Sequence, residues 1–332
     1  MKILKHIIYG IVGMVLSNEL SHAQRVDYSI LSVPEEKGVT FTRITSDGDY
    51  VCMPEIRRSF KNLNWFSSRI LDISPDGKTL AFISNRNNCT NIFLKQLDKL
   101  NSSTQRTNRS NVLDVSFSPD GTKICFSEVR GKSYQIFQTH SQQGYACRQI
   151  TNGNMDFSPM YSADMQTIFF ARQETSETSI WSFNMQNNSL SNYTNGMNPY
   201  PIPGETAFLC ARMGSQGRSE IWKVNYESGV EECLVSDKER DFTSPSLSPD
   251  GKWILFVGSS KISSNEETFD RYYWNTDIFV SKIDGTQFTQ ITYHAADDVS
   301  PVWSKDGEYI YFISQRGSAL GIANVWKINF IY

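Results

Sequence analysis

Six short, mainly apolar runs recur along this chain, each four or five residues long. They occupy residues 79–83, 123–126, 167–170, 207–210, 253–256 and 309–312. Aromatic and β-branched residues dominate them, which is typical of β-strands. After a loop of variable length, each run is followed by an apolar–aromatic pair: Ile92-Phe93, Ile136-Phe137, Ile180-Trp181, Ile221-Trp222, Ile278-Phe279 and Val325-Trp326. The pattern predicts six copies of one β unit.

A polar turn precedes each apolar run. Residues 74–77, 118–121 and 248–251 all read Ser-Pro-Asp-Gly, residues 162–165 and 304–307 are variants of it, and residues 202–205 fill the remaining position. Proline presets the first φ angle, aspartate bonds the local backbone, and glycine supplies a positive φ, so the turn suits a tight antiparallel connection. Four short strands every 40–50 residues or so are the signature of a propeller blade.

The two ends of the chain complement each other. The sixth repeat stops at residues 325–330, after its third strand, whereas Thr40–Thr45 closely matches Gln287–Thr292, the fourth strand of the fifth repeat. We therefore expect the N-terminal strand to complete the last blade, which closes the ring and removes an exposed edge. The predicted fold is an all-β, six-bladed β-propeller of four-stranded antiparallel blades, spanning residues 40–332.

The N-terminal residues have the pattern of a secretory signal. Lys2 and Lys5 precede a short apolar stretch at 7–16, and Ser21-His22-Ala23 has the small-x-small form of a cleavage site. We interpret residues 1–23 as a signal peptide and 24–39 as a lead segment; the alternative for the former is a short membrane anchor. No other long apolar run occurs, so we expect no transmembrane segment after cleavage and a periplasmic or secreted location.

Charge and cysteine content exclude some classes of function. The formal net charge of −3 offers no general attraction for nucleic acid. Six cysteines allow several pairings, but Cys125 and Cys210 lie within strand runs where other repeats carry apolar residues, so we expect both to be buried filling residues. No Cys-x-x-Cys spacing occurs, which argues against structural zinc.

The Ser-Pro-Asp-Gly turns, the apolar–aromatic pairs and the closing strand resemble the propeller of TolB, a periplasmic component of bacterial envelope systems. The resemblance covers about residues 40–330. TolB also has an N-terminal α/β domain, which we do not expect here because only residues 24–39 precede the closing strand. The repeat is also similar to propellers of dipeptidyl peptidase IV-like proteases and of sugar-active proteins, so fold does not settle function. No Gly-x-Ser-x-Gly nucleophile motif occurs.

In a four-stranded blade, the loops between the second and third strands share one face of the disc with the loops between blades. The first set carries arginines: Arg86, Arg130, Arg172, Arg212 and Arg316. The second set carries acids: Asp47, Asp49, Asp156, Asp241, Asp297 and Asp298. We expect both sets to meet on this face. One interpretation is that the arginines pair with the acids and stabilise the blade junctions; the other is a charged mouth that binds an anionic peptide end or a polar ligand.

The fifth repeat contains a non-repetitive insertion with four aromatic residues: Phe269, Tyr272, Tyr273 and Trp274. Aromatic residues beside charges are typical of protein interfaces. They form either a recognition surface or rings that pack back on their own blade. Residues 50–68, with Trp65 and Phe66, make a second long loop on the same face.

Catalytic motifs are weak. Beyond residue 23 the chain has only two histidines, His140 and His294, and His294 lies close to Asp297 and Asp298. Our leading hypothesis is a non-enzymatic, exported propeller that binds an envelope protein or peptide and needs no cofactor. The alternative is a carbohydrate-binding protein or a metal-assisted enzyme that uses the central funnel, with His294 and one of these aspartates holding the metal.

Overall fold

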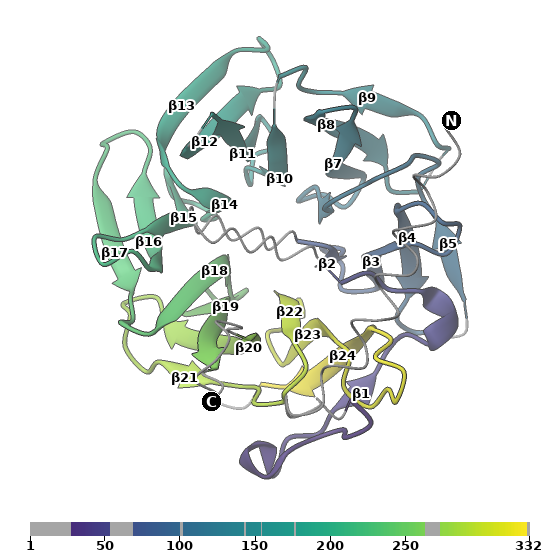
Figure 1. The fold of residues 1–332 in the computed structure, drawn as a ribbon. Helices are drawn as coiled ribbons and strands as arrows, with labels where there is room; N and C mark the ends of the chain where they lie inside the picture. The colour runs from purple at the N-terminus through teal and green to yellow at the C-terminus, as the bar shows by residue number, and fades with distance from the viewer. Residues whose placement is uncertain are drawn as a thin grey trace, which may run out of the picture.

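The computed structural model describes residues 28–53, 69–99, 102–142, 144–153, 155–175, 177–262 and 273–330. Within these ranges, 24 strands form six antiparallel sheets of four strands each. The sheets follow one another around a central axis, as the blades of a propeller (Figure 1). The predicted fold class and number of blades are therefore confirmed.

Blades 1 to 3 each use four consecutive strands. Blade 1 contains β2 (Leu71–Ile73), β3 (Thr79–Ser84), β4 (Asn91–Gln96) and β5 (Ser103–Gln105). Blade 2 contains β6 (Ser116–Phe117), β7 (Lys123–Arg130), β8 (Ser133–His140) and β9 (Cys147–Gln149). Blade 3 contains β10 (Asp156–Tyr161), β11 (Thr167–Glu174), β12 (Glu177–Asn184) and β13 (Leu190–Asn195). In each, the first strand lies nearest the axis and the fourth lies at the rim (Figure 1).

Blades 4 and 5 repeat this arrangement, and blade 6 combines both ends of the chain. Blade 4 contains β14 (Met197–Pro201), β15 (Ala207–Met213), β16 (Ser219–Asn225) and β17 (Glu231–Val235). Blade 5 contains β18 (Arg240–Leu247), β19 (Trp253–Ile262), β20 (Tyr273–Lys282) and β21 (Thr289–Gln290). Blade 6 contains β22 (Asp298–Trp303), β23 (Tyr309–Ser314), β24 (Asn324–Asn329) and, outermost, β1 (Thr42–Arg43). Two short 3-10 helices flank β1: η1 (Pro34–Glu36) and η2 (Asp47–Asp49).

The closing strand pairs where the sequence predicted. Thr42 lies opposite Lys327 and Arg43 opposite Trp326 in the antiparallel register of β1 and β24. Beyond the strand, Ile44 N–H donates to the carbonyl of Val325 at 2.8 Å. The side chain of Thr45 then accepts the N–H of Val325 at 2.9 Å. Chain closure therefore rests on backbone pairing extended by a threonine side chain.

The threonine that follows the outer strand has the same function in several blades. The hydroxyls of Thr107, Thr151 and Thr292 accept the backbone N–H of Ile92, Ile136 and Ile278, at 2.9, 3.1 and 3.0 Å. In each case the donor is the first residue of the apolar–aromatic pair, whose side chain is fully buried. The threonine thus satisfies a backbone donor at the point where the outer strand stops pairing.

The polar turns share one hydrogen-bond pattern. In blade 2, Ser118 Oγ lies 2.6 Å from Asp120 Oδ1 and accepts the N–H of Lys123 at 2.9 Å. Gly121 completes the turn with a φ of 71°, a conformation that glycine adopts without strain. The same serine–aspartate contact, at 2.5 to 2.6 Å, recurs in blades 1, 3, 5 and 6. The motif is therefore a structural device of the blade.

Replacing Ser118 with alanine is expected to lower the free energy of unfolding by about 1–3 kcal/mol. The side chain is buried, and its loss would leave the N–H of Lys123 without its partner. Urea denaturation followed by tryptophan fluorescence measures the change. Ser189→Ala, at an exposed turn of blade 3, is the matched control and should change stability by less than about 0.5 kcal/mol; equal losses in both variants would contradict the assignment.

Three Ser-Pro pairs lie inside the inner strands and not at their first residues. Ser158, Ser244 and Ser300, with Asn198 in blade 4, have φ values of 51° to 55° and lie at register shifts of the inner strand. Each is a β-bulge, followed by a proline. Proline is tolerated there because the inner strand is a sheet edge facing the central channel.

The blades pack through aromatic and aliphatic side chains. Phe82, Phe126, Phe170, Phe256 and Phe312, from the second strands of five blades, are fully buried. Cys125 and Cys210 are also fully buried, which confirms the prediction that they fill the core, and all six cysteines carry free thiols. Among the described residues, no helix has the length and apolar character needed to cross a membrane.

Candidate functional site

The topology sorts the connections as expected. The Ser-Pro-Asp-Gly turns join first and second strands at one face, and the loops between second and third strands share the opposite face with the inter-blade loops. We call this opposite face the loop face. In blade 3, Asp156 at the start of β10 lies directly opposite Arg172 near the end of β11. The strand register itself therefore brings an acid and an arginine together.

Arg172 and Asp156 form a two-pronged ion pair. Arg172 Nε and Nη2 donate to the two carboxylate oxygens at 2.6 and 3.0 Å, and the carboxylate is fully buried. The guanidinium also lies 4.6 Å from the ring centre of Trp181, the aromatic residue of the apolar–aromatic pair. Gly153 makes room for the pair, since a Cβ there would lie 2.7 Å from Arg172 Nη2. Charge pairing and ring stacking hold this arginine at the blade junction.

Arg86 follows the same plan in blade 1. It donates to Asp49 at 2.8 Å and to Ser103 on β5 at 2.8 Å, and its guanidinium lies 4.6 Å from the ring centre of Phe93. Buried Lys95 adds a second cation 3.1 Å from Asp49. Burial opposes ionisation of Asp49, but the hydrogen bonds from its neighbours prevail and lower its pKa. Arg86 therefore reaches outward to the rim of the blade.

Arg212 has a partner that the sequence did not indicate. It pairs with Glu231 on the outer strand β17 at 2.5 Å and stacks 3.7 Å from the ring centre of Trp222. Glu231 also accepts a hydrogen bond from Thr194 of blade 3 at 2.7 Å. Burial raises the pKa of Glu231, but the hydrogen bonds from Arg212 and Thr194 outweigh it, so the net pKa is lowered. This group links the rims of blades 3 and 4.

The remaining predicted acids are also engaged. Asp241 accepts from Arg218 at 2.9 Å and from the N–H of Ser219 at 2.8 Å. Asp297 accepts the N–H and the hydroxyl of Thr276 at 3.0 and 2.8 Å. Arg218 is not one of the repeated arginines. The fifth repeat lacks such an arginine, and Asp241 is paired from the neighbouring blade instead.

Blade 6 holds the most deeply buried charges. Arg316 donates to both oxygens of Glu36, at 3.2 and 3.1 Å, and to Asp298 at 2.5 Å. The side chains of all three residues have no exposed surface. Glu36 comes from the lead segment, and no motif in that segment predicts that it would lie at this junction. Asp298 and Arg316 are brought together as predicted, in a junction that the N-terminal residues cover.

His294 is a structural histidine in this arrangement. Its Nδ1 accepts the N–H of Ala296 at 2.8 Å, so Nε2 carries the proton and donates to the carbonyl of Ile30 at 3.1 Å. Burial, with Arg316 nearby, lowers its pKa and favours the neutral ring. Both ring nitrogens are thus occupied, which leaves no lone pair for a metal. Among the described residues, no three His, Cys, Asp or Glu side chains are arranged to hold a metal ion.

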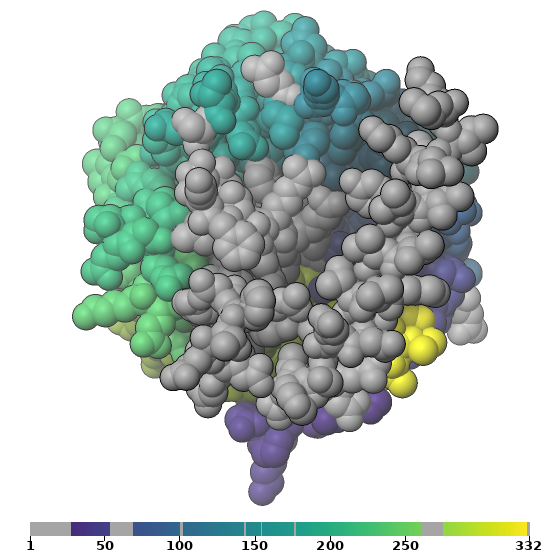
Figure 2. All heavy atoms as spheres, in the orientation of Figure 1, coloured from purple at the N-terminus to yellow at the C-terminus, as the bar shows by residue number. Residues whose placement is uncertain are grey.

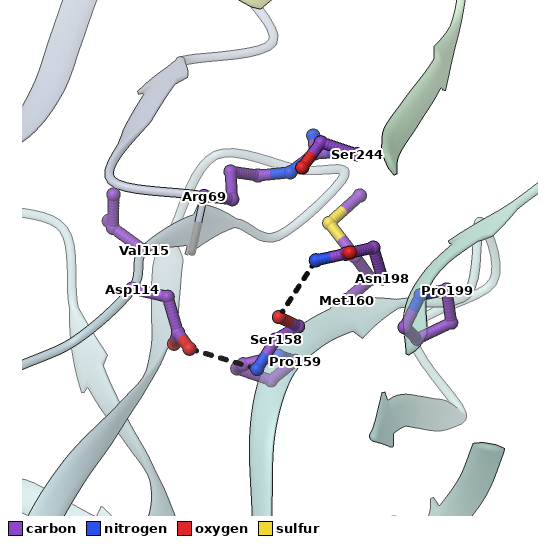
Figure 3. Close-up of a pocket in the computed structure, with 9 residues that line it drawn as sticks. All are labelled: Arg69, Asp114, Val115, Ser158, Pro159, Met160, Asn198, Pro199 and Ser244. Atoms are coloured by element: carbon purple, nitrogen blue, oxygen red, sulfur yellow. Dashed lines mark hydrogen bonds between the residues drawn. The ribbon is translucent and has the colours of Figure 1, made fainter. Parts of the chain in front are cut away.

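Arg69 bridges blades on different sides of the central channel. Arg69 of blade 1 donates to the carbonyl of Pro245 in blade 5 at 3.3 Å and lies 5.3 Å from the ring centre of Tyr200 in blade 4. Figure 3 shows Arg69 reaching toward Ser244, with Asp114 and Asn198 both directed at Ser158. Asp114 accepts the N–H of Ser158 at 2.8 Å, and its burial raises its pKa.

The aromatic insertion is only partly within the described residues. Phe269 and Tyr272 lie outside them, as do residues 54–68 of the other long loop. Tyr273 and Trp274 belong to β20, with Tyr273 opposite Ile262 and Trp274 opposite Lys261. The space-filling view shows the described blades following one another around the rim (Figure 2).

β19 and β20 form the longest hairpin of the ring. Each spans ten residues, whereas the second strands of the other blades span six to eight. The hairpin therefore extends farther at the loop face than its counterparts, and its end carries the backbone of two of the predicted aromatic residues.

Fold and loop arrangement define the class of protein as a six-bladed β-propeller closed by its N-terminal strand. Residues 67–201 match the family model described as TolB beta propeller domain. The Tol-Pal system protein TolB of Francisella tularensis subsp. mediasiatica is 32% identical over 204 residues, which cover 60% of this chain and 44% of the relative. Residues 67–201 are thus similar to the propeller of TolB, and the chain spans less than half the length of the curated relatives it matches.

Solved structures agree on the fold. TolB from Acinetobacter baumannii superposes with a TM-score of 0.58 at 17% identity, over 76% of this chain and 64% of that one. An oligogalacturonate lyase from Vibrio parahaemolyticus gives a TM-score of 0.58 at 11% identity, over 90% and 96% of the two chains. At these identities, what is shared is the architecture alone, because one propeller fold supports unrelated functions.

Proposed function

We propose that this chain is an exported, TolB-like propeller that binds a protein or peptide partner in the cell envelope. The observation that carries the proposal is the similarity to TolB, a protein named as a component of a Tol-Pal system. The sequence pattern of residues 1–23 supports export to the periplasm or beyond. The metal-assisted enzyme, the alternative, would use His294 as a ligand, and the hydrogen bonds of both its ring nitrogens make that role less favourable.

We assign partner contact to the end of the β19–β20 hairpin. The repeated arginines are poor candidates for a first contact, because Arg86, Arg172 and Arg316 are already paired with acids of this chain. A partner would have to break those pairs. The hairpin extends at the loop face and ends in an aromatic-rich segment, which is the composition that contributes most binding energy at interfaces.

Replacing Phe269, Tyr272, Tyr273 and Trp274 together with alanine is expected to reduce partner recovery by roughly tenfold or more, because aromatic hot spots each contribute about 2 kcal/mol or more. The tagged full chain is expressed in its own host, crosslinked in intact cells and purified from the periplasmic fraction. Quantitative mass spectrometry then compares the recovered proteins.

The matched control replaces Leu190 and Val230 with alanine. Both are exposed apolar residues on the rim, away from the hairpin. This variant should recover partners as the wild type does. Unchanged recovery with the hairpin variant would exclude the hairpin as the contact, and absence of the protein from the periplasmic fraction would contradict export itself.

A further inference from the structure

Among the described residues, the junction between blades 5 and 6 buries more carboxyl groups than it has cations to pair with them. Asp298 and Glu36 share the guanidinium of Arg316, and a third acid, Asp277 of β20, is only 5% exposed. Asp297 adds a fourth carboxylate nearby, and His294 is held in its neutral form. Within the described ranges, these acids, His294 and Arg316 are the titratable groups that face Asp277 from η1, β22, the loop before β22 and the loop after β23.

Arg316 has no donor left for Asp277. Its Nη1 donates to Glu36 and to the carbonyl of Leu31, its Nη2 to Glu36 and Asp298, and its Nε to Ser314. All three nitrogens are thus engaged by other acceptors. With respect to the residues that the structure describes, an ionised Asp277 would be a buried charge without a cation in contact, which is among the costliest states in a protein interior.

The hydrogen bonds of Asp277 accommodate a neutral carboxylic acid at lower cost than a carboxylate. Its Oδ2 accepts two amide N–H groups, from Asn275 at 3.2 Å and Gln290 at 3.1 Å. Its Oδ1 is buried and, within the described part of the chain, has no hydrogen-bond partner. A carboxylate would leave a charged oxygen bare, whereas a neutral acid places its carbonyl oxygen between two donors and its hydroxyl at the bare position.

The lead segment is held by this same junction. Gly317 and Ser318 donate their N–H groups to the carbonyls of Ile30 and Tyr28, at 2.8 and 2.7 Å. Tyr293 N–H donates to Glu36 at 2.9 Å. These contacts, the Glu36–Arg316 pair and the hydrogen bonds from His294 to Ile30 and from Arg316 to Leu31 hold residues 28–36 on blade 6.

We propose that this junction is a proton-dependent clasp, in which a proton on Asp277 keeps residues 28–36 docked on blade 6 and its loss loosens them. If Asp277 were ionised, its charge would repel the carboxylates of Glu36 and Asp298, which already share the single positive charge of Arg316. Asp298 is fixed in the core strand β22, whereas Glu36 lies on a short segment, so release of Glu36 is the least costly way to relieve the repulsion. Burial, followed by the charge of Asp298, raises the pKa of Asp277 to about 9, in line with this geometry.

The sign of the effect follows from linkage. The docked state binds this proton up to about pH 9, whereas an exposed aspartate releases it near pH 4. Docking of residues 28–36 is therefore favoured at low pH and weakens as pH rises through this window. The equilibrium constant for undocking should rise by up to about tenfold per pH unit. Asp277→Asn keeps the shape and a neutral group, so its opening should not respond to pH in this way.

Hydrogen exchange of the full chain tests the proposal. Peptides covering residues 28–39, 290–296 and 315–321 report the amides of the clasp. At each pH from about 6 to 9, wild type and Asp277→Asn are compared directly, so that the intrinsic pH dependence of exchange cancels. We expect these peptides to exchange faster in the wild type than in Asp277→Asn at alkaline pH. The ratio of the two exchange rates should grow by up to about tenfold per pH unit.

Asp241→Asn is the matched control, because Asp241 is an equally buried aspartate at the neighbouring junction but pairs with Arg218. It should loosen its own junction and leave the three clasp peptides unchanged. A wild-type to Asp277→Asn ratio that stays constant with pH would overturn the proposal. So would clasp peptides that are less protected in Asp277→Asn than in the wild type at every pH.

A wild-type measurement covers the case in which Asp277→Asn does not fold. In uniformly 13C-labelled protein, the carboxyl resonance assigned to Asp277 by its correlations to the backbone should keep the shift of a protonated acid at pH 7 and titrate near pH 9. Its absence would overturn the proposal. A divalent cation could also offset the surplus charge, and a loss of clasp protection on adding EDTA would assign the site to a cation and reject the proton.

Discussion

Replacing Arg316 with methionine is expected to lower the free energy of unfolding by about 3–5 kcal/mol, because it leaves two buried carboxylates without a cation. Methionine fills much of the volume but offers no donor. Glu36 and Asp298, both without exposed side-chain surface, would then lose their cation. Urea denaturation at neutral pH measures the loss.

Arg212→Met is the matched control for this substitution. Arg212 also stacks on an aromatic ring and pairs with an acid, but Glu231 keeps 32% of its side-chain surface exposed. Solvent can replace the lost pair, so the expected cost is about 1 kcal/mol or less. Adding Glu36→Gln to Arg316→Met should recover part of the stability. Equal losses for the two methionine variants would show that burial of the charges is not the cause.

The ring and its closure were predictable because the information is local and repeated. Three turns read Ser-Pro-Asp-Gly, two are variants and one fills the remaining position, and this six-fold recurrence along the chain defines the blades. The match of Thr40–Thr45 to Gln287–Thr292 predicts the closing strand from the sequence alone. The pairing of Arg172 with Asp156 also followed, since the connectivity of a blade puts both chain segments on one face.

Other features depend on contacts that leave no local signal. Glu36 meets Arg316 across 280 residues, and nothing in the lead segment marks its glutamate as buried. One of the two interpretations of the sequence pairs Arg212 with an inter-blade acid, but the connection between β13 and β14 is Gly196 alone, so Glu231 of the outer strand supplies the carboxylate. The absence of an acid from this connection could have predicted that the partner of Arg212 lies elsewhere. The bulges at the Ser-Pro pairs depend on a positive φ at serine, which sequence alone does not indicate.

Removing residues 1–45 is expected to destabilise the ring by more than about 5 kcal/mol and to make the protein self-associate. The truncation deletes β1, exposes the hydrogen-bonding edge of β24, leaves Val325 N–H without Thr45 and strips Glu36 from Arg316. It also uncovers the core around Ile44, which is 6% exposed. Thermal unfolding measures the first effect, and light scattering after gel filtration measures the second.

A chain that begins at Tyr28 is the control, because it retains η1, β1 and every contact that the structure describes for the lead segment. It should match the full chain in stability and remain in the same oligomeric state. A synthetic peptide of residues 28–47, added to the truncated protein, should bind to the open edge and restore the melting temperature, because the edge of β24 is a preformed partner for this strand. A truncated protein that is as stable and as monodisperse as the full chain would mean that the other five blades hold the ring without the N-terminal strand.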